Sequence, residues 1–200
     1  CGDRESARCW YQLARLAAVA EVDDAGLGAL MYNRAAIGVT HLLVMRALDS
    51  GLDMDSWAVY LAEVESGFNY QQGTRIDGLA DLTNQSLARM QLLKGHYGDA
   101  LAILRALRES PVRTISEASV LGEIAFCQAK LGTLASDPSV LRAAESCMPP
   151  VDADDRLLHW SNLCACYTAL DEPQQVAAML RRKELATEQY RSNQEELRRV

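Results

Sequence analysis

The stretch Leu92-Leu93-Lys94-Gly95 ends one strongly apolar helical segment and precedes another, and this kind of ending occurs four times in the 200-residue chain. The other three endings are Leu48-Asp49-Ser50-Gly51, Lys130-Leu131-Gly132 and Ala169-Leu170-Asp171. Their closing residues, Gly51, Gly95, Gly132 and Asp171, follow one another at intervals of 44, 37 and 39 residues, which is within the range of helical repeat periods. The pattern predicts stacked antiparallel helical hairpins, and a chain of this kind usually binds something.

The composition favours a folded, all-α chain. Hydrophobic residues make up 49% of the sequence, which is enough for a sizeable core. No stretch shows the strict alternation of apolar and polar residues that marks a half-buried strand. We therefore expect an all-α fold of about nine helices, separated by glycine and proline punctuation.

The charge and the hydropathy pattern exclude two kinds of partner. With 20 basic and 27 acidic residues the net charge is -7, which argues against direct binding of nucleic acid by this segment. The longest apolar run, residues 35–45, is interrupted by polar residues and falls short of the ~18 to 20 residues that a membrane-spanning helix needs. We expect a buried core helix there and no membrane span.

The six cysteines lack the dense, regular spacing of a small disulfide scaffold. Cys164 and Cys166 are two residues apart on an expected helix, so they point to nearly opposite faces and cannot share a metal ion. The sequence favours buried free thiols, a reducing compartment and therefore a cytoplasmic location. The alternative is a membrane-anchored periplasmic lipoprotein that begins at Cys1.

The apolar periodicity and the capping residues predict where the helices lie. The first, over residues 5–22, places Trp10, Leu13, Leu16 and Val19 on one apolar face. A third helix is expected to start at Asp55 as its N-cap, with a loop over Ser66 to Gly73 behind it. The other expected helices cover residues 27–48, 75–93, 97–109, 116–131, 138–147, 155–170 and 173–200.

One stretch, residues 84–107, has the residues of a known helical hairpin. It combines Leu87, Ala88 and Gln91 with the turn Gly95-His96-Tyr97 and then Ala100 and Leu104. Weaker versions of the same order are Trp160, Leu163, Cys164, Tyr167; Leu121, Ile124, Ala125, Gln128, Gly132; and residues 44–51. These stretches resemble the tetratricopeptide (TPR) repeat, although Asn84 takes the usual tryptophan position and the intervals exceed the ideal module. The resemblance covers roughly residues 35–200 and implies an α-solenoid of degenerate, TPR-like hairpins.

The resemblance also implies a domain organisation and a binding surface. Residues 1–34 form an N-terminal helical region, residues 35–175 the TPR-like repeats, and residues 176–200 a charged C-terminal helix that leads to a further domain. The first helices of successive hairpins would line an inner groove for a protein or peptide, and the residues expected to face it are His41, Met45, Gln85, Arg89, Phe126, Ser161, Ala165 and Thr168. Two of them have a structural alternative: Arg89 could pair with a carboxylate of an adjacent helix, and Phe126 could pack between hairpins.

The sequence offers no pattern typical of catalysis. It has no glycine-rich phosphate loop, no metal-binding His-Glu-x-x-His helix and no Gly-x-Ser-x-Gly elbow. The three histidines, at positions 41, 96 and 159, fall in separate expected hairpins. We therefore predict no catalytic residue, no metal site and no cofactor, and we assign the acidic run 152–155 to stabilisation of a helix N-terminus.

The functional hypothesis is a protein- or peptide-binding helical-repeat module. It would act as the regulatory or scaffolding part of a larger protein, since the charged last helix loosely resembles the exit from TPR sensor regions of bacterial signalling proteins. One alternative is a small-molecule sensor that uses a cavity between hairpins. Others are an envelope lipoprotein scaffold anchored at Cys1 and a homodimer formed through the C-terminal helix.

Overall fold

The computed structural model describes residues 4–51, 54–74, 79–110 and 115–199, so the expected anchor at Cys1 lies outside the described residues. The described part contains α-helices and no strand, which confirms the all-α fold class. Its helices are α1 (Arg4–Ala20), α2 (Asp24–Ala47), α3 (Met54–Thr74), α4 (Ala80–Lys94), α5 (Tyr97–Glu109), α6 (Glu117–Lys130), α7 (Ser139–Ser146), α8 (Ala153–Ala169) and α9 (Pro173–Arg199). A short 3-10 helix, η2 (Leu134–Ser136), precedes α7.

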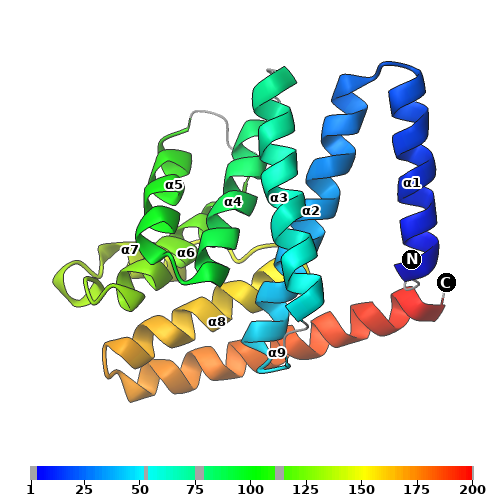
Figure 1. Cartoon of the computed structure of the whole chain (residues 1–200). Coiled ribbons are helices and arrows are strands. Elements are labelled where there is room, and N and C mark those ends of the chain that lie inside the picture. Colours follow the sequence, from blue (N-terminus) through cyan, green and yellow to red (C-terminus); the bar gives the residue numbers. More distant parts are fainter. Residues whose placement is uncertain (1–3, 52–53, 75–78, 111–114, 200) are drawn as a thin grey trace.

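Successive helices pack as neighbours, with α8 and α9 forming a long pair across one end of the molecule (Figure 1). The helix α2 packs against α3, α4 and α8, and α6 packs against α5, α7 and α8. We call α2, α4, α6 and α8 the inner helices. In an ideal solenoid each repeat contacts only its neighbours, whereas here α2 and α8 meet across the molecule. The solenoid arrangement stays a prediction.

Residues with a left-handed backbone conformation follow the helices near the endings predicted from the sequence. Backbone φ is positive at Gly95 (78°), Gly132 (72°), Asp49 (52°) and Asp171 (55°). After α4, the His96 amide donates to the Gln91 carbonyl at 2.9 Å, which gives a partner to a carbonyl of the last turn. The predicted first closing residue, Gly51, is wrong: Asp49 takes the left-handed conformation instead, because a short polar side chain tolerates it.

The predicted loop over Ser66 to Gly73 is also wrong, because these residues continue α3. Tertiary contacts outweigh their low helix propensity. The Tyr70 hydroxyl donates to Asp24 Oδ1 at the start of α2 at 2.8 Å, and the Thr74 hydroxyl donates back to the Tyr70 carbonyl at 3.0 Å. Asp55 lies inside α3 rather than at its cap, and residues 75–78 of the next expected helix lie outside the described residues.

The core runs through α2 to α9, with Val64 as the buried contribution of α3. Its largest fully buried side chains are Leu42, Met90, Leu92, Leu104, Leu121, Ile124, Leu134, Leu141, Leu157, Leu163, Met179 and His159. Gly38 lets α2 and α3 approach closely, since a Cβ atom at this position would lie 2.2 Å from the Tyr60 ring. The predicted boundaries at residues 34/35 and 175/176 fall inside α2 and α9, so the helices run continuously across them.

Two expectations from the sequence concern membrane-spanning helices and the burial of the cysteines. No helix in the described ranges is long and apolar enough to cross a membrane. Cys127 and Cys166 are buried free thiols, as expected, and burial raises the pKa of each to about 12. Cys9 is exposed, which corrects the expectation of burial for that residue.

Candidate functional site

Four polar side chains meet between the inner helices, and we call Thr40, Arg89, Glu123 and Asp155 the polar centre. Arg89 on α4 donates from Nε to Glu123 Oε1 on α6 and from Nη2 to Asp155 Oδ1 on α8, both at 2.7 Å. Its Nη1 donates to the Thr40 hydroxyl on α2 at 3.1 Å. One guanidinium group therefore ties all four inner helices together.

Burial and neighbouring charges shift the pKa values of Arg89, Glu123 and Asp154. Burial opposes the charge on Arg89, but the carboxylates of Glu123 and Asp155 outweigh it and raise the pKa of Arg89 above its usual value. Burial raises the pKa of Glu123, with Arg89 acting in the opposite direction. Burial and the charge of Asp155 likewise raise the pKa of neighbouring Asp154. The guanidinium of Arg89 thus serves two carboxyl groups, Glu123 and Asp155.

A cavity of about 100 Å³ lies beside the polar centre between the inner helices, and we call it the inner cavity. Its polar lining residues are Arg46, Glu123, Ser161 and Asn162, and its apolar ones are Leu43, Ala47, Leu92, Phe126, Leu158 and Ala165. Glu123 is the link to the polar centre. Its Oε1 accepts from Arg89, and its fully buried carboxyl group also has the Gln85 side-chain amide beside it, whose hydrogen bonding acts to lower the pKa of Glu123.

Arg46 brings a second charge to the inner cavity. Its Nη1 donates to the Leu92 carbonyl at 3.0 Å, and its guanidinium lies 5.8 Å from the centre of the Phe126 ring. Burial lowers the pKa of Arg46. The Lys130 ammonium lies 5.3 Å from the same ring, and the Tyr97 ring meets it edge-on at 6.0 Å. Phe126 is therefore held on several sides and is only 8% exposed.

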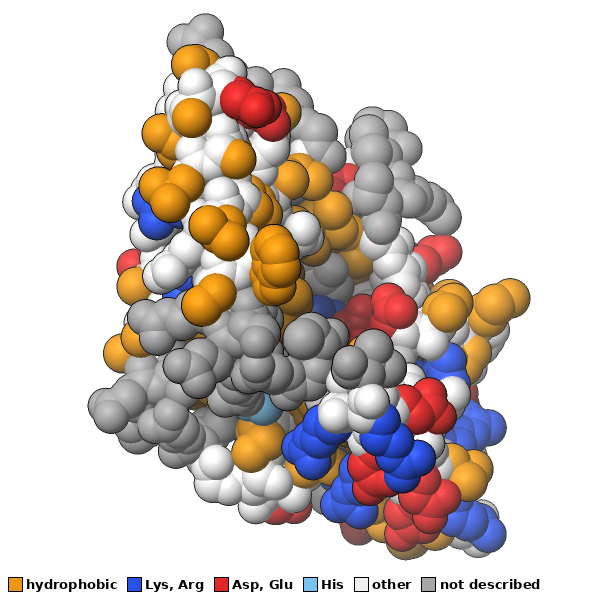
Figure 2. Space-filling model, turned by 90° about the vertical axis from the view of Figure 1, so that its right-hand side faces the viewer, with side chains coloured by type: hydrophobic (Ala, Val, Ile, Leu, Met, Phe, Trp, Pro, Cys, Tyr) orange, Lys and Arg blue, Asp and Glu red, His pale blue; other side chains and the backbone are white. Residues whose placement is uncertain are grey.

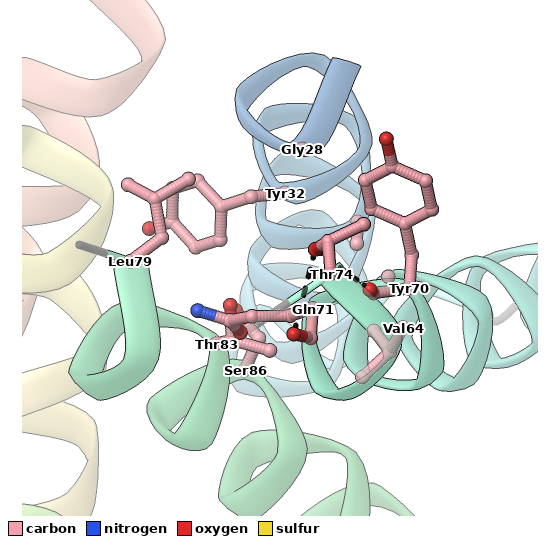
Figure 3. Close-up of a pocket in the computed structure, with 11 residues that line it drawn as sticks. Gly28, Tyr32, Val64, Tyr70, Gln71, Thr74, Leu79, Thr83 and Ser86 are labelled. Carbon is pink, nitrogen blue, oxygen red and sulfur yellow. Dashed lines mark hydrogen bonds between the residues drawn. The ribbon is translucent and has the colours of Figure 1, made fainter. Parts of the chain in front are cut away.

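A second cavity, the outer cavity, lies between α2, α3 and the start of α4 and has a volume of only about 20 Å³ (Figure 3). In Figure 3 the Tyr32 and Leu79 side chains border one side, and the Gln71 side chain extends toward Thr83. Two of its hydroxyl groups are already used by the backbone, because Thr74 donates to the Tyr70 carbonyl and Ser86 to the Leu82 carbonyl. The outer cavity therefore offers mainly apolar surface.

The structure brings only some of the predicted groove residues to one place. Phe126, Ser161 and Ala165 line the inner cavity. Gln85 and Arg89 are buried at 7% and 6% exposure, so neither lies on an open surface. His41 and Met45 are half-buried, and Thr168 is exposed with its hydroxyl donated to the Cys164 carbonyl. The helices α2 and α8 pack against each other across the inner face. A role of these residues in partner binding stays a prediction.

Sequence reasoning missed Thr40, Glu123, Asp155 and Arg46 as parts of a shared site. A signal for Glu123 was present, because it is the one charged residue in the stretch 118–129, which is otherwise apolar except for Gly122, Ser119 and Gln128. A lone acid on a buried helix face needs a cationic partner. Asp155, assigned to helix-end stabilisation, also pairs with Arg89, whose side chain is buried while that of Asp155 is 26% exposed.

His159 lies in the core beside α6. It is 1% exposed, its Nδ1 lies 3.1 Å from the Ala118 carbonyl oxygen, and burial lowers its pKa to about 4. Its Nδ1 also lies 3.1 Å from the place where a Cβ atom would stand at Gly122. His159 is thus a neutral packing residue that joins α8 to α6.

The helix α1 turns its apolar residues away from the rest of the molecule. Its inner side contacts α2, where the Arg34 guanidinium lies 4.7 Å from the centre of the Tyr11 ring and Ala18 is buried. The predicted apolar face is exposed instead, and we call it the α1 face: Trp10 (70%), Leu13 (57%), Leu16 (67%) and Val19 (57%). Figure 2, which views the molecule from this side, shows hydrophobic side chains following one another along α1.

The charged C-terminal helix packs against α8 along part of its length. Met179 and Ala186 of α9 are buried, and the Arg182 guanidinium lies 4.9 Å from the centre of the Trp160 ring. Leu180, Leu185 and Leu197 are exposed at 42%, 68% and 45%. They are scattered among charged residues, and a homodimer through α9 stays a prediction.

Among the described residues, no group of three or more His, Cys, Asp and Glu side chains could hold a metal ion. Comparisons with protein-family models, with curated proteins and with solved structures found nothing that matches this chain. The TPR resemblance accordingly rests on the residues quoted above.

Proposed function

We propose that this chain is a protein-binding helical module with a regulatory or scaffolding role, and that its partner docks on the α1 face as an amphipathic helix. The observation that supports the proposal is the outward orientation of Trp10, Leu13, Leu16 and Val19. A contiguous apolar surface on a folded chain is typical of an interaction site.

The energetics favour an occupant for the α1 face. Each apolar side chain of this size contributes about 1.5–3 kcal/mol when it leaves water. The side of α1 that carries Tyr11 and Ala18 packs against α2. Leu13 and Leu16 on the opposite side are therefore not needed to hold α1 in place. A partner that covers Leu13 and Leu16 would gain the free energy of removing these side chains from water.

The spacing on α1 selects the kind of partner. The four residues of the α1 face follow one another every three positions on a helix of 17 residues, so they form an oblique ridge that turns by about 60° per step, with Leu13 and Leu16 at its centre. A ridge of this kind packs into the groove of a second helix that presents apolar residues at intervals of three and four. We therefore expect an amphipathic helix rather than an extended peptide.

The experiment begins with a photoreactive amino acid at Leu13, which identifies proteins in contact with the α1 face in an extract. A partner found this way is purified, and its affinity is measured by calorimetry for the wild type and for Leu13→Gln. We expect affinity to fall about tenfold or more, since a buried Leu contributes over 1.4 kcal/mol. Leu185→Gln, the same change at an exposed leucine of α9, is the matched control and should bind as the wild type does.

Two results would overturn the proposal. The first is equal affinity of the purified partner for Leu13→Gln and the wild type. The second is cross-linking from Leu13 to another copy of this chain alone, which would make the α1 face a self-association surface. Circular dichroism of each variant shows that α1 has remained helical.

A further inference from the structure

We infer that the partner helix lies along α1 at a shallow angle and carries basic residues at the end that meets the turn after α1. This inference rests on the proposed function, because it adds the course and the charge of the helix that covers the α1 face. It starts from the narrow attachment of α1. Among the side chains that the structure describes on this helix, only Tyr11 and Ala18 are not exposed.

The side of α1 opposite Tyr11 and Ala18 carries a straight apolar stripe. It consists of four exposed residues, Cys9, Leu13, Leu16 and Ala20. With about 100° of rotation per residue, these positions lie within about 60° of one another. Their spacing of four, three and four residues is that of the seam between two helices in a coiled coil. A helix that covers the stripe therefore follows α1 rather than crossing it.

The oblique ridge of the α1 face agrees with this course. When a ridge of residues three apart packs into grooves between residues four apart, the two helices cross at only about 20°. The small side chains of Cys9 and Ala20 at the ends of the stripe leave room for the partner backbone to approach. At about 1.5 Å per residue, the contact then extends over about 17 Å of α1.

The charged residues near the stripe gather at one of its ends. Arg15 is the one charged residue in the stretch 9–20. The turn after α1 then carries three exposed acidic residues, Glu21, Asp23 and Asp24. The chain reverses there at Val22, whose φ is 56°, so the three acidic residues lie at the end of α1. Figure 2 shows acidic side chains at the upper end of α1.

Two of these carboxylates are held at the start of α2. Asp23 Oδ1 accepts from the Gly26 amide at 2.9 Å, and Asp24 Oδ1 accepts from the Tyr70 hydroxyl at 2.8 Å. The C-terminal end of α1 adds partial negative charge. Lysine and arginine side chains of a partner are attracted to this end, and acidic side chains are repelled from it. The basic residues of the partner should therefore lie where its helix passes Ala20.

The first test maps the contacts of the partner that is identified through Leu13. A photoreactive amino acid replaces Cys9 in one variant and Ala20 in another, and mass spectrometry locates each adduct on the purified partner. We expect the two adducts to lie about 11 residues apart on one helix, with lysine and arginine concentrated at the end reached from Ala20. Adducts within a single turn of the partner helix would show a steep crossing and overturn the inference.

The second test measures the charge. The affinity of the partner for the wild type and for Glu21→Lys is measured by calorimetry over a salt series. We expect Glu21→Lys to bind about threefold or more weakly at about 50 mM salt, and the difference to shrink at about 0.5 M, because salt screens exposed charges. A lysine near a helix C-terminus is favourable, so the variant should keep α1 helical. Glu184→Lys, the same change at an exposed position of α9, is the matched control.

The outcomes separate this inference from the proposed function. Weaker binding by Leu13→Gln together with equal binding by Glu21→Lys and the wild type would keep the docking surface and overturn the basic partner. Equal losses for Glu21→Lys and Glu184→Lys would also overturn it, since the effect would then come from net charge. Unchanged binding by Leu13→Gln would remove the proposed function and this inference with it.

Discussion

Replacing Arg89 by methionine should be among the most destabilising single changes in this chain. The Glu123 side chain is 3% exposed, so loss of the guanidinium leaves a buried carboxylate without its cation. Breaking a buried pair in this way costs about 3–5 kcal/mol. The Asp155 side chain is 26% exposed and can be solvated, so it adds little. Since a domain of this size loses about 2–4 °C of Tm per kcal/mol, Tm should fall by about 6–20 °C.

The assay is urea unfolding of the wild type and Arg89→Met followed by far-UV circular dichroism. Arg34→Met is the matched control, because the Arg34–Glu63 pair is partly exposed and should contribute no more than about 1 kcal/mol. The double variant Arg89→Met, Glu123→Gln should regain about 1–3 kcal/mol relative to Arg89→Met, since it removes the stranded charge. Equal losses for Arg89→Met and Arg34→Met would refute the assignment of a buried, coupled polar centre.

Three further predictions concern other parts of the fold. The pKa of His159 is lowered to about 4 by burial, so the unfolded chain takes up the proton first as the pH falls. Stability should decrease by about 3 kcal/mol between about pH 6.5 and pH 4 in denaturant titrations, and His159→Asn should remove that part of the slope. Val22 is a β-branched residue with φ of 56°, so Val22→Gly should raise the free energy of unfolding by about 1 kcal/mol, whereas Val151→Gly, at an equally exposed valine without positive φ, should not. Burial and the raised pKa of Cys127 should make its alkylation by iodoacetamide much slower than that of exposed Cys9 in mass-spectrometric time courses, and equal rates would mean that Cys127 is accessible.

The local signals in the sequence were the most dependable. The helix over residues 97–109 has the predicted limits, because it lies between a glycine turn and a proline. Ser116 caps α6 by accepting from the Ser119 amide at 3.4 Å, as its position before the apolar stretch suggested. Local rules failed where tertiary contacts decided the outcome. Ser66 to Gly73 stayed helical because α2 and α4 pack against α3.

The site was harder to predict because its parts come from distant segments. Arg89 and Asp155 are 66 residues apart in the sequence. Their pairing depends on the packing of α2 against α8, which the periodicity of the sequence does not predict. The repeat resemblance implied an open inner groove, and the structure instead buries Arg89 and leaves a small cavity. On α1 the spacing predicted an apolar face from Trp10 to Val19, but not that this face is exposed, which depends on how α1 packs against α2.

The most direct test of the proposed binding function compares photo-crosslinking from two positions in the same extract. One probe replaces Leu13 on the α1 face, and the other replaces Thr168, the exposed residue of the predicted groove. The account predicts that Leu13 yields a specific protein adduct that excess unlabelled chain removes, and that Thr168 yields none. A specific adduct from Thr168 without one from Leu13 would contradict it and return the binding surface to the inner helices.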